Sequence, residues 1–409
     1  MANILYVGID VSSSSNSACF MSDDGSIVAK NSFSNDLSGA NQFIESLLYH
    51  LRANGYKKII AATESTSFFS FHITDFLATH KALCPYHPEI YQLNPKIVKS
   101  FKKGSYTDFS KTDSSDALAI ADRLRFGRLP KPYQEHKPFL PLQRLTRYRF
   151  HLTECLTREK SYFLTHLYLK FSKFSNQCPF SNAFGTTSLS CVTEFLTVDE
   201  IANTDVSELV NFIQRQGKNR FAEPEKIAQS LKEIASDSYR LRPELNRSVN
   251  LILSSTLCTI RHLQKSLKDI NSSISKEINA FPNTLQSIQG IGPVYSAGIL
   301  SEIGSIENFA SEAALAKFSG LTWRQYQSGD FKAEETPISK TGNQYLRYYL
   351  IEAANALRMH NAEYQEYYHK KFNEVKKHQH KRALVLTARN FVRLVFALLK
   401  KGQLYKPAN

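Results

Sequence analysis

Two apolar runs in the first third of the chain each end in an acidic residue, and this pattern constrains the fold more than any other feature. Residues 4–9 read Ile-Leu-Tyr-Val-Gly-Ile and lead into Asp10, while residues 59–63 read Ile-Ile-Ala-Ala-Thr and lead into Glu64. Short apolar runs of this kind predict buried strands. If the two strands belong to one sheet, both carboxylates lie at its carboxyl edge.

A second acidic pair, Asp113 and Asp116, begins a predicted helix that runs over residues 113–126 and ends at Gly127. Residues three apart share a helix face, so all four acids can meet at the sheet edge. Four unpaired carboxylates would repel one another, and this predicts a divalent metal, Mg²⁺ or Mn²⁺. Each acid alone is equally well explained as a loop acid or a first-turn helix acid, so the prediction depends on the joint pattern.

The other patterns of the N-terminal third alternate between strand and helix. A hairpin is expected from residues 18–21 and 27–33, followed by helices at 40–54 and 68–78 and a strand at 90–93. Three adjacent early strands followed by a βαβ arrangement predict a ribonuclease H-like sheet. We therefore expect an α/β domain over residues 1–130.

The remaining chain has mainly helical patterns. Prolines at 130, 132, 138 and 141 mark a linker, and residues 142–174 predict a long helix with basic and aromatic side chains. We expect residues 175–225 to be a loop-rich insertion with short helices. A second long helix is expected from about 227 to 279, paired with the first as a coiled coil and interrupted at Pro243. The predicted helical coiled-coil region spans residues 131–280.

A glycine-rich turn opens the expected C-terminal domain, residues 281–409. Gly290, Ile291, Gly292 and Pro293 precede a helix of small residues, as in a helix-hairpin-helix, whose turn presents backbone N–H groups to a DNA phosphate. Ordinary packing of two helices can use the same glycines. The strongly basic region that follows favours the DNA-binding interpretation.

Positive charge is concentrated in the later part of the chain. The 409 residues carry a formal net charge of +14, yet residues 1–127 hold 12 Lys and Arg against 12 Asp and Glu. Residues 340–409 hold 14 basic and 4 acidic residues. The whole excess therefore lies in residues 128–409, and this C-terminal half is predicted to bind a polyanion, with nucleic acid the first candidate. The alternative is a solvated basic surface that aids solubility.

Other features bear on the cellular location. The late apolar stretch at 383–399 contains Arg389 and Arg393, and no uncharged segment is long enough to cross a bilayer. The N-terminus has no signal-peptide pattern. The six cysteines show no C-x-x-C pair and no spacing typical of a zinc site. We therefore expect them to be free thiols in a reducing compartment. We expect an intracellular, cytoplasmic protein that does not associate with a membrane.

Several motifs, in order along nearly the whole chain, resemble those of the IS110 family of insertion-sequence transposases, which are site-specific DNA recombinases. The chain departs from the usual pattern at Ser67, where many relatives have Gly, and in the added length at 175–225. The matching motifs are Gly8-Ile9-Asp10-Val11, Thr63-Glu64-Ser65-Thr66, Asn94-Pro95, Lys111 through Ala117, Gly290 through Pro293, Gly320-Leu321-Thr322, Ser328-Gly329, Ile338 through Asn343, Leu346-Arg347, and the basic segment from His380 to Arg389.

This resemblance implies a RuvC-like domain, a coiled coil and a C-terminal transposase domain with a nucleophilic serine. The DEDD tetrad would be Asp10, Glu64, Asp113 and Asp116. For the nucleophile we favour Ser328, because the adjacent Gly329 leaves room for a phosphate, and Ser339 is the second choice. Taken alone, either serine would be a turn or N-cap residue.

The implied reaction joins the serine to DNA in a covalent phosphoserine intermediate and stores the broken bond for rejoining. Arg324, Lys340 and Arg347 would neutralise phosphate oxygens, or make plain backbone-phosphate contacts. Donor and target duplexes require dimers that assemble into a tetramer. The resemblance also implies a structured noncoding guide RNA, as in the RNA-guided "bridge" recombinases.

Two other functions fit parts of the sequence. One is a RuvC-like, metal-dependent DNA endonuclease or resolvase that hydrolyses DNA without serine chemistry. The other is a nucleic-acid-binding protein whose acids are only structural.

Overall fold

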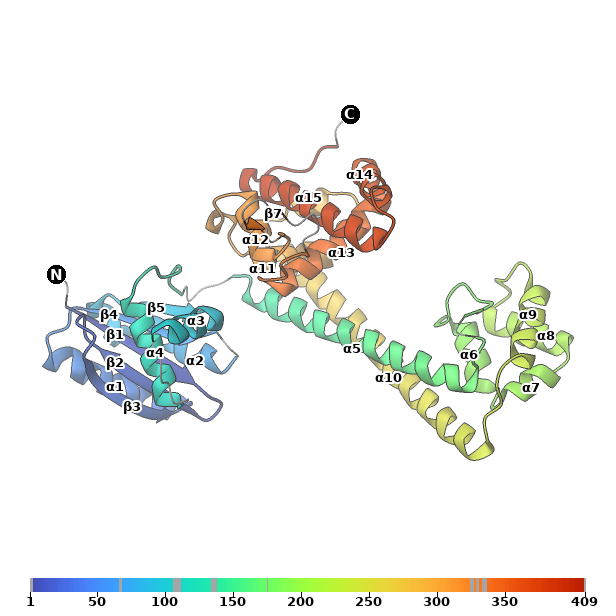
Figure 1. The fold of residues 1–409 in the computed structure, drawn as a ribbon, viewed down its shortest axis with the longest axis horizontal. Coiled ribbons are helices and arrows are strands. Elements are labelled where there is room, and N and C mark those ends of the chain that lie inside the picture. The colour runs from blue at the N-terminus through green and yellow to red at the C-terminus, as the bar shows by residue number, and fades with distance from the viewer. Residues whose placement is uncertain are drawn as a thin grey trace. The chain divides into compact units, whose positions relative to one another are not determined.

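The computed structural model describes residues 3–65, 68–105, 112–133, 138–174, 176–323, 327–328, 331–332 and 337–407; of 327–328 and 331–332 it describes the backbone. The chain divides into two compact units, residues 1–137 and 138–409. Figure 1 shows a sheet with helices in the first unit and mainly helices in the second. Among the described residues, no helix combines the length and apolar character needed to span a membrane.

The first unit contains a mixed five-stranded sheet in the order β3-β2-β1-β4-β5. β1 pairs with β2, and β2 with β3, in antiparallel fashion, whereas β1, β4 and β5 run parallel. The sequence prediction of an α/β region followed by a mainly helical chain is therefore confirmed. The strands are β1 (Ile4–Val11), β2 (Ser15–Met21), β3 (Ile27–Ser34), β4 (Lys58–Glu64) and β5 (Glu89–Leu93).

Helices cover both faces of this sheet, because its strands are apolar on both sides. Phe43 and Leu47 of α1 pack with Phe20 and Ile59 in the core of one face, which also takes in α2. On the opposite face, α4 packs over β1, β2 and β4. The helical segments are α1 (Leu37–Ala53), α2 (Phe69–Thr79), η1 (Lys81–Tyr86), α3 (Pro95–Ser105) and α4 (Asp113–Arg125).

A long helical hairpin forms the middle of the second unit. α5 (Leu140–Lys170) and α10 (Pro243–Glu277) pack along each other and run in opposite directions (Figure 1). The sequence predicted one long helix from about residue 227, interrupted at Pro243. The structure has this break: α9 (Pro224–Ser236) ends before it, and α10 begins at Pro243. Proline suits this first helical position, where its missing N–H removes no hydrogen bond.

The distal lobe, which we define as residues 171–242, connects the two helices of the hairpin. Where the sequence suggested loops with short helices, the structure has α6 (Thr186–Glu194), α7 (Val198–Asn203) and α8 (Val206–Gly217), packed with α9 on one apolar core. The chain enters and leaves the lobe at neighbouring points. Ser172 Oγ accepts from Tyr239 N at 3.2 Å, and Ser238 Oγ accepts from Lys173 N at 3.2 Å.

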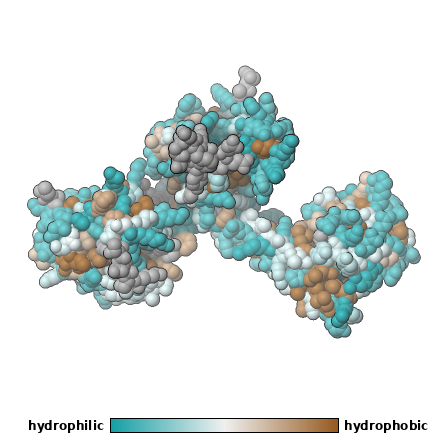
Figure 2. Space-filling model, viewed as in Figure 1, coloured by the Kyte–Doolittle hydropathy of each residue, from teal (hydrophilic) through white to brown (hydrophobic). Residues whose placement is uncertain are grey.

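The distal lobe differs from the rest of the second unit in charge. Its 72 residues hold 8 Lys and Arg against 9 Asp and Glu, in contrast to the basic C-terminal segment. Figure 2 shows apolar surface at the lobe end of the hairpin. Leu196 of the lobe and Leu251 of α10 are among the exposed apolar residues. The prediction of polyanion binding therefore applies to the C-terminal part and not to the lobe.

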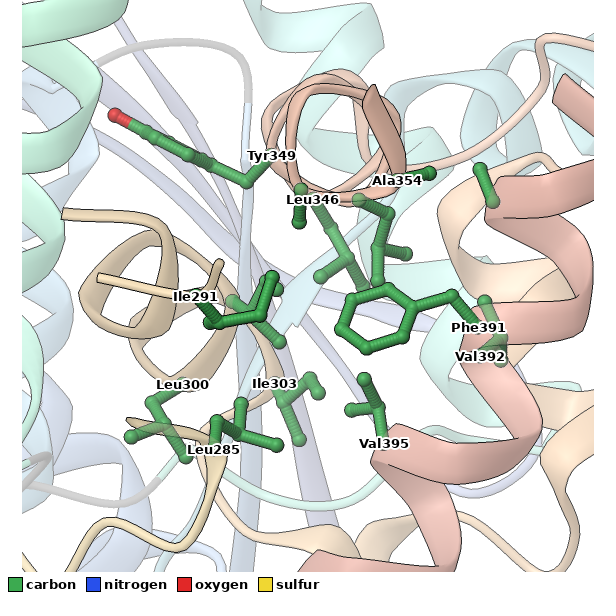
Figure 3. Close-up of a cluster of buried hydrophobic side chains, with 14 of the residues drawn as sticks. Leu285, Ile291, Leu300, Ile303, Leu346, Tyr349, Ala354, Phe391, Val392 and Val395 are labelled. Carbon is green, nitrogen blue, oxygen red and sulfur yellow. The ribbon is translucent and has the colours of Figure 1, made fainter. Parts of the chain in front are cut away.

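The C-terminal part packs around α11 and α13. In Figure 3, Ile291, Leu300 and Ile303 lie across from Leu346, Phe391 and Val395 in a buried cluster. The glycine-rich turn follows the short 3₁₀ segment η3 and leads into α11. The elements are η2 (Ile278–Ala280), η3 (Leu285–Ser287), α11 (Pro293–Ile303), η4 (Ile306–Asn308), α12 (Glu312–Ser319), β6 (Gln327–Ser328), β7 (Phe331–Lys332), α13 (Gln344–His360), α14 (Ala362–Asn373) and α15 (Gln379–Lys401).

Candidate functional site

The four predicted acids come from three elements that meet at one end of the sheet. Asp10 and Glu64 follow Ile9 and Thr63, which are paired in the parallel strands β1 and β4. The two carboxylates therefore belong to the same sheet edge. Asp113 and Asp116 lie in the first turn of α4, which packs over these strands.

Gly8 allows α4 to lie directly on β1. A Cβ placed on Gly8 would be 2.2 Å from the carbonyl oxygen of Ala117 and 2.3 Å from the amide nitrogen of Ala121. Any side chain there would have to push the helix backbone away from the strand. Glycine thus brings the first turn of α4 to the end of β1.

A capping box fixes the start of α4. Thr112 Oγ1 accepts from Ser115 N at 3.2 Å, and Ser115 Oγ accepts from Thr112 N at 3.0 Å. The cap satisfies two backbone donors and sets the first turn that carries Asp113 and Asp116. Free N–H groups at a helix start also favour nearby negative charge.

The carboxylates influence one another electrostatically. Burial raises the pKa of Asp10, and the charges of Asp116 and Asp113 raise it further. Burial also raises the pKa of Glu64, to about 6, with added repulsion from Asp10 and Asp116. The four acids therefore form one electrostatic cluster, which a cation would stabilise.

Lys102 supplies positive charge to this cluster. Its ammonium on α3 pairs with the carboxylate of Asp116, and both side chains are largely shielded from solvent. Its charge lowers the pKa of both Asp10 and Glu64. Sequence reasoning missed Lys102, because no spacing pattern links it to the acids.

Hard carboxylate oxygens that repel one another are the donor chemistry that suits Mg²⁺ or Mn²⁺. In the part of the chain that the structure describes, however, no three Asp, Glu, His or Cys side chains lie close enough together to hold a metal ion. The cluster thus matches a metal site in donor type and electrostatics, and its acids would have to move closer together to bind an ion.

The two candidate serines lie in the segment between α12 and α13. Ser328 belongs to β6 and pairs through its backbone with Phe331 of β7, while its side chain, Gly329 and Arg324 lie outside the described residues. Ser339 lies in the stem of the segment, which we define as residues 320–323 and 338–343. Its N–H donates to Thr322 O at 2.7 Å, and its Oγ lies 3.2 Å from Thr322 Oγ1 and 3.5 Å from Gly320 O.

Arg347 fastens the stem of this segment. Its Nη1 donates to Ser319 O at 3.0 Å and to Lys340 O at 3.2 Å, and burial lowers its pKa. Lys340 itself has a positive φ of 50°. A Cβ on Gly342 would lie 2.3 Å from Phe318 O, so the stem requires glycine there. Arg347 thus has a structural role in this structure besides its predicted phosphate contact.

The two predicted glycines of the DNA-binding turn differ in surroundings. Gly290 has a φ of +91°, and a Cβ there would lie 3.1 Å from His360 Cβ. Gly292 precedes Pro293 at the start of α11, and a Cβ there would meet no atom within 4 Å. The backbone at Gly292 is therefore open to a ligand, whereas Gly290 is required by packing.

Comparison with known proteins gives matches to both parts of the chain that carry candidate residues. A family model for DEDD transposases of IS110 matches residues 7–172, which include all four acids. A second, described as the transposase IS116/IS110/IS902 family, matches residues 283–369, which include both serines and both turn glycines. Residues 173–282 lie between the two matches.

Two similar proteins come from mobile elements. An uncharacterized 44.8 kDa protein of insertion element IS116 from Streptomyces clavuligerus is 24% identical over 312 residues, 75% of each chain. The transposase for insertion sequence element IS1111A from Coxiella burnetii (strain RSA 493 / Nine Mile phase I) is 29% identical over 159 residues, which cover 38% of this chain and 42% of that protein.

Proposed function

Since the chain belongs to the IS110 family of transposases, enzymes that cleave and rejoin DNA, we propose that it acts through a covalent phosphoserine intermediate assisted by its acidic tetrad. The main observation behind this proposal is the electrostatic cluster that Asp10 and Glu64 form with Asp113 and Asp116 of the first turn of α4. The mixed sheet that carries Asp10 and Glu64 supports a ribonuclease H-like, RuvC-like domain.

Membership of the DEDD transposases suggests a requirement for a divalent metal ion. We propose that the tetrad would hold this ion, and that it is Mg²⁺ or Mn²⁺. When bound, the metal would supply positive charge to polarise a DNA phosphate. The protein's own contribution is to bring the carboxylates to one edge of the sheet: the β1–β4 pairing aligns Asp10 with Glu64, and the α4 cap orients the first turn that carries the other two.

In the proposed step, Ser328 Oγ attacks a phosphodiester phosphorus. A P–Oγ bond forms, the P–O3′ bond breaks, and the leaving O3′ takes a proton to become a free 3′-hydroxyl. The serine proton passes to solvent. The reverse attack by a 3′-hydroxyl reseals a strand and frees the serine, so no external energy source is needed.

Ser339 is the second candidate for this step. Its Oγ already contacts Thr322 Oγ1 and Gly320 O, and its amide is part of the stem. Those contacts suit a structural serine, so Ser328 remains the first choice.

We propose that nucleic acid binds to the C-terminal part through the Gly290–Gly292 turn and the cations Arg324, Lys340 and Arg347. The 14 basic residues in the last 70 support this assignment. In the full reaction, dimers would assemble into a tetramer on donor and target DNA at the bacterial nucleoid. A structured noncoding RNA would guide the choice of both sites.

The test is strand cleavage and exchange on DNA from the element's ends, with the flanking noncoding RNA and Mg²⁺. Ser328→Ala should abolish the covalent protein–DNA adduct, and Asp10→Ala should abolish cleavage. Ser339→Ala should retain adduct formation. If both serine variants cleave normally and no adduct forms, the protein is instead a metal-dependent nuclease of RuvC type.

A further inference from the structure

The carboxylate of Glu302, on α11, is completely buried. It accepts four hydrogen bonds: to Oε1 from Arg147 Nε at 2.7 Å, and to Oε2 from Arg147 Nη2 at 2.8 Å, Asn343 Nδ2 at 2.7 Å and Gln143 Nε2 at 3.4 Å. A buried carboxylate is unfavourable unless such donors surround it. Glu302 therefore joins three elements, since Gln143 and Arg147 belong to α5 and Asn343 precedes α13.

Arg147 is held in place on both sides of its guanidinium. One edge makes the two hydrogen bonds to Glu302, and the guanidinium lies 4.6 Å from the centre of the Tyr345 ring. An arginine with paired hydrogen bonds and an aromatic neighbour has one strongly favoured geometry. Arg147 thus fixes Glu302 relative to the hairpin.

Asn343 is the last residue of the segment that carries both candidate serines. Its Oδ1 caps α13 by accepting from Tyr345 N at 2.9 Å and Leu346 N at 3.0 Å, and its own N–H donates to Phe318 O at 2.7 Å. Its remaining polar group, Nδ2, donates to Glu302. Glu302 thus binds the end of the serine-bearing segment directly.

From these contacts we infer that Glu302 is a positioning residue for the nucleophile. Through Asn343 it fixes the end of the serine-bearing segment, and through Arg147 it ties that end to α5. Arg347 fastens the same stem to α12 through Ser319 and to the segment itself through Lys340. Among the hydrogen bonds described for Asn343 and Arg347, the bond from Asn343 to Glu302 is the one that leads to the hairpin. The inference rests on the proposed function in one respect, that this segment carries the attacking hydroxyl.

The proposed role of Glu302 concerns the rate of DNA cleavage and not the affinity for DNA. Glu302 is shielded from solvent, and its negative charge would repel a phosphate. Loosening the segment would misplace the hydroxyl, and a displacement of about 1 Å can slow an enzymatic step by about 100-fold. Loss of Glu302 should therefore lower the cleavage rate at saturating DNA and leave the Kd for DNA unchanged.

An exchange of the two hydrogen-bonding partners provides the sharpest test. Asn343→Asp keeps the cap acceptor of α13 but places a second carboxylate against Glu302 and removes the Nδ2 donor. Adding Glu302→Gln removes the repulsion between the two carboxylates and lets the side-chain amide at position 302 donate to the carboxylate at 343, although that amide nitrogen no longer accepts from Arg147 Nη2 and Gln143 Nε2. Glu307→Gln is the matched control, since Glu307 is a carboxylate of the same unit that pairs with Lys400 at the surface.

Single-turnover cleavage and DNA binding would be measured for each variant. We expect Asn343→Asp to cleave about 10- to 100-fold more slowly than wild type, with the Kd within twofold, and the double variant to regain part of the rate. Glu307→Gln should match wild type. A double variant no faster than Asn343→Asp, or an Asn343→Asp variant with wild-type rate, would overturn the inference.

Hydrogen exchange separates this inference from the proposed function. Amides of residues 320–323 and 338–343 should exchange faster in Asn343→Asp than in wild type and recover protection in the double variant. This readout requires no catalysis. If wild type itself forms no adduct while exchange follows this pattern, the phosphoserine mechanism fails and the role of Glu302 in holding the segment stands. Unchanged exchange in Asn343→Asp would contradict that role.

Discussion

Gly8 of β1 and Ala117 of α4 meet backbone to backbone, so closely that a Cβ on Gly8 would lie 2.2 Å from the Ala117 carbonyl oxygen. This contact sets the height of α4 above the sheet. Asp113 and Asp116 are in the first turn of the same helix, and so the packing of one glycine determines how near they come to Asp10. Fold and candidate chemistry are linked at this point.

The first prediction concerns this contact. Gly8→Ala should lift α4 from β1, lower the stability of the first unit by roughly 1–3 kcal/mol and abolish DNA cleavage. Thermal unfolding and a cleavage assay would measure both effects. Gly104→Ala is the control, because a Cβ there meets no atom within 4 Å and its φ is not positive. Equal melting temperatures for the two variants would contradict the prediction.

The second prediction concerns Lys102. Lys102→Met removes the cation beside Asp116 and should lower the stability of the metal-free protein by about 1–2 kcal/mol, because the remaining carboxylates repel one another. Added Mg²⁺ should then raise the melting temperature of this variant more than that of wild type. Lys103→Met, at the exposed neighbouring position, should behave as wild type.

The third prediction concerns pH and the distal lobe. Burial lowers the pKa of Lys170 to about 8, against 10.5 for an ordinary lysine, although its Nζ donates to Val192 O and Phe195 O at 2.7 Å each. Between these values the unfolded chain binds more protons than the folded one, so stability should rise with pH. From pH 8 to 9.5 the gain is about 2 kcal/mol.

Thermal unfolding of wild type and Lys170→Met at pH 8 and 9.5 would measure this effect. The pH-dependent gain should disappear in Lys170→Met, since the group that titrates is gone. A variant that gains as much stability as wild type would show that another group is responsible.

The fourth prediction concerns nucleic-acid binding. Lys340→Gln should weaken binding to DNA of any sequence and reduce the slope of log K against log salt by about 0.9, as expected when one phosphate contact is lost. Titrations at several salt concentrations would provide the slope. Lys226→Gln in the distal lobe, where Lys226 is exposed and pairs with Glu223, should leave both values unchanged.

The sequence predicted those parts of the site that follow periodic patterns. Asp10 and Glu64 follow apolar strands, and the pair at 113 and 116 follows a capping threonine, so local rules place them correctly at strand and helix ends. Glu302 was missed because its network joins residues about 155 and 41 positions away in the chain. The sequence did contain one sign of a buried acid: Glu302 is the single charged residue in a stretch of small and apolar residues from Ala297 to Ile303.

The distal lobe shows why a loop-rich insertion with short helices was expected where several helices pack on one core. Its Ser-, Thr- and Asn-rich stretch has weak helical periodicity, and α7 is only six residues long. Short helices of this kind are stabilised by tertiary packing, here on the shared core with the ends of α5 and α10. Local sequence rules do not contain that information.

The crossed hydrogen bonds of Ser172 with Tyr239 and Ser238 with Lys173 have a practical meaning for the architecture. They hold the first and last residues of the lobe next to each other, so that the whole lobe serves as the connection between two antiparallel helices. A different folded domain with adjacent termini, such as a fluorescent reporter, should therefore be able to replace residues 171–242 without unfolding either long helix.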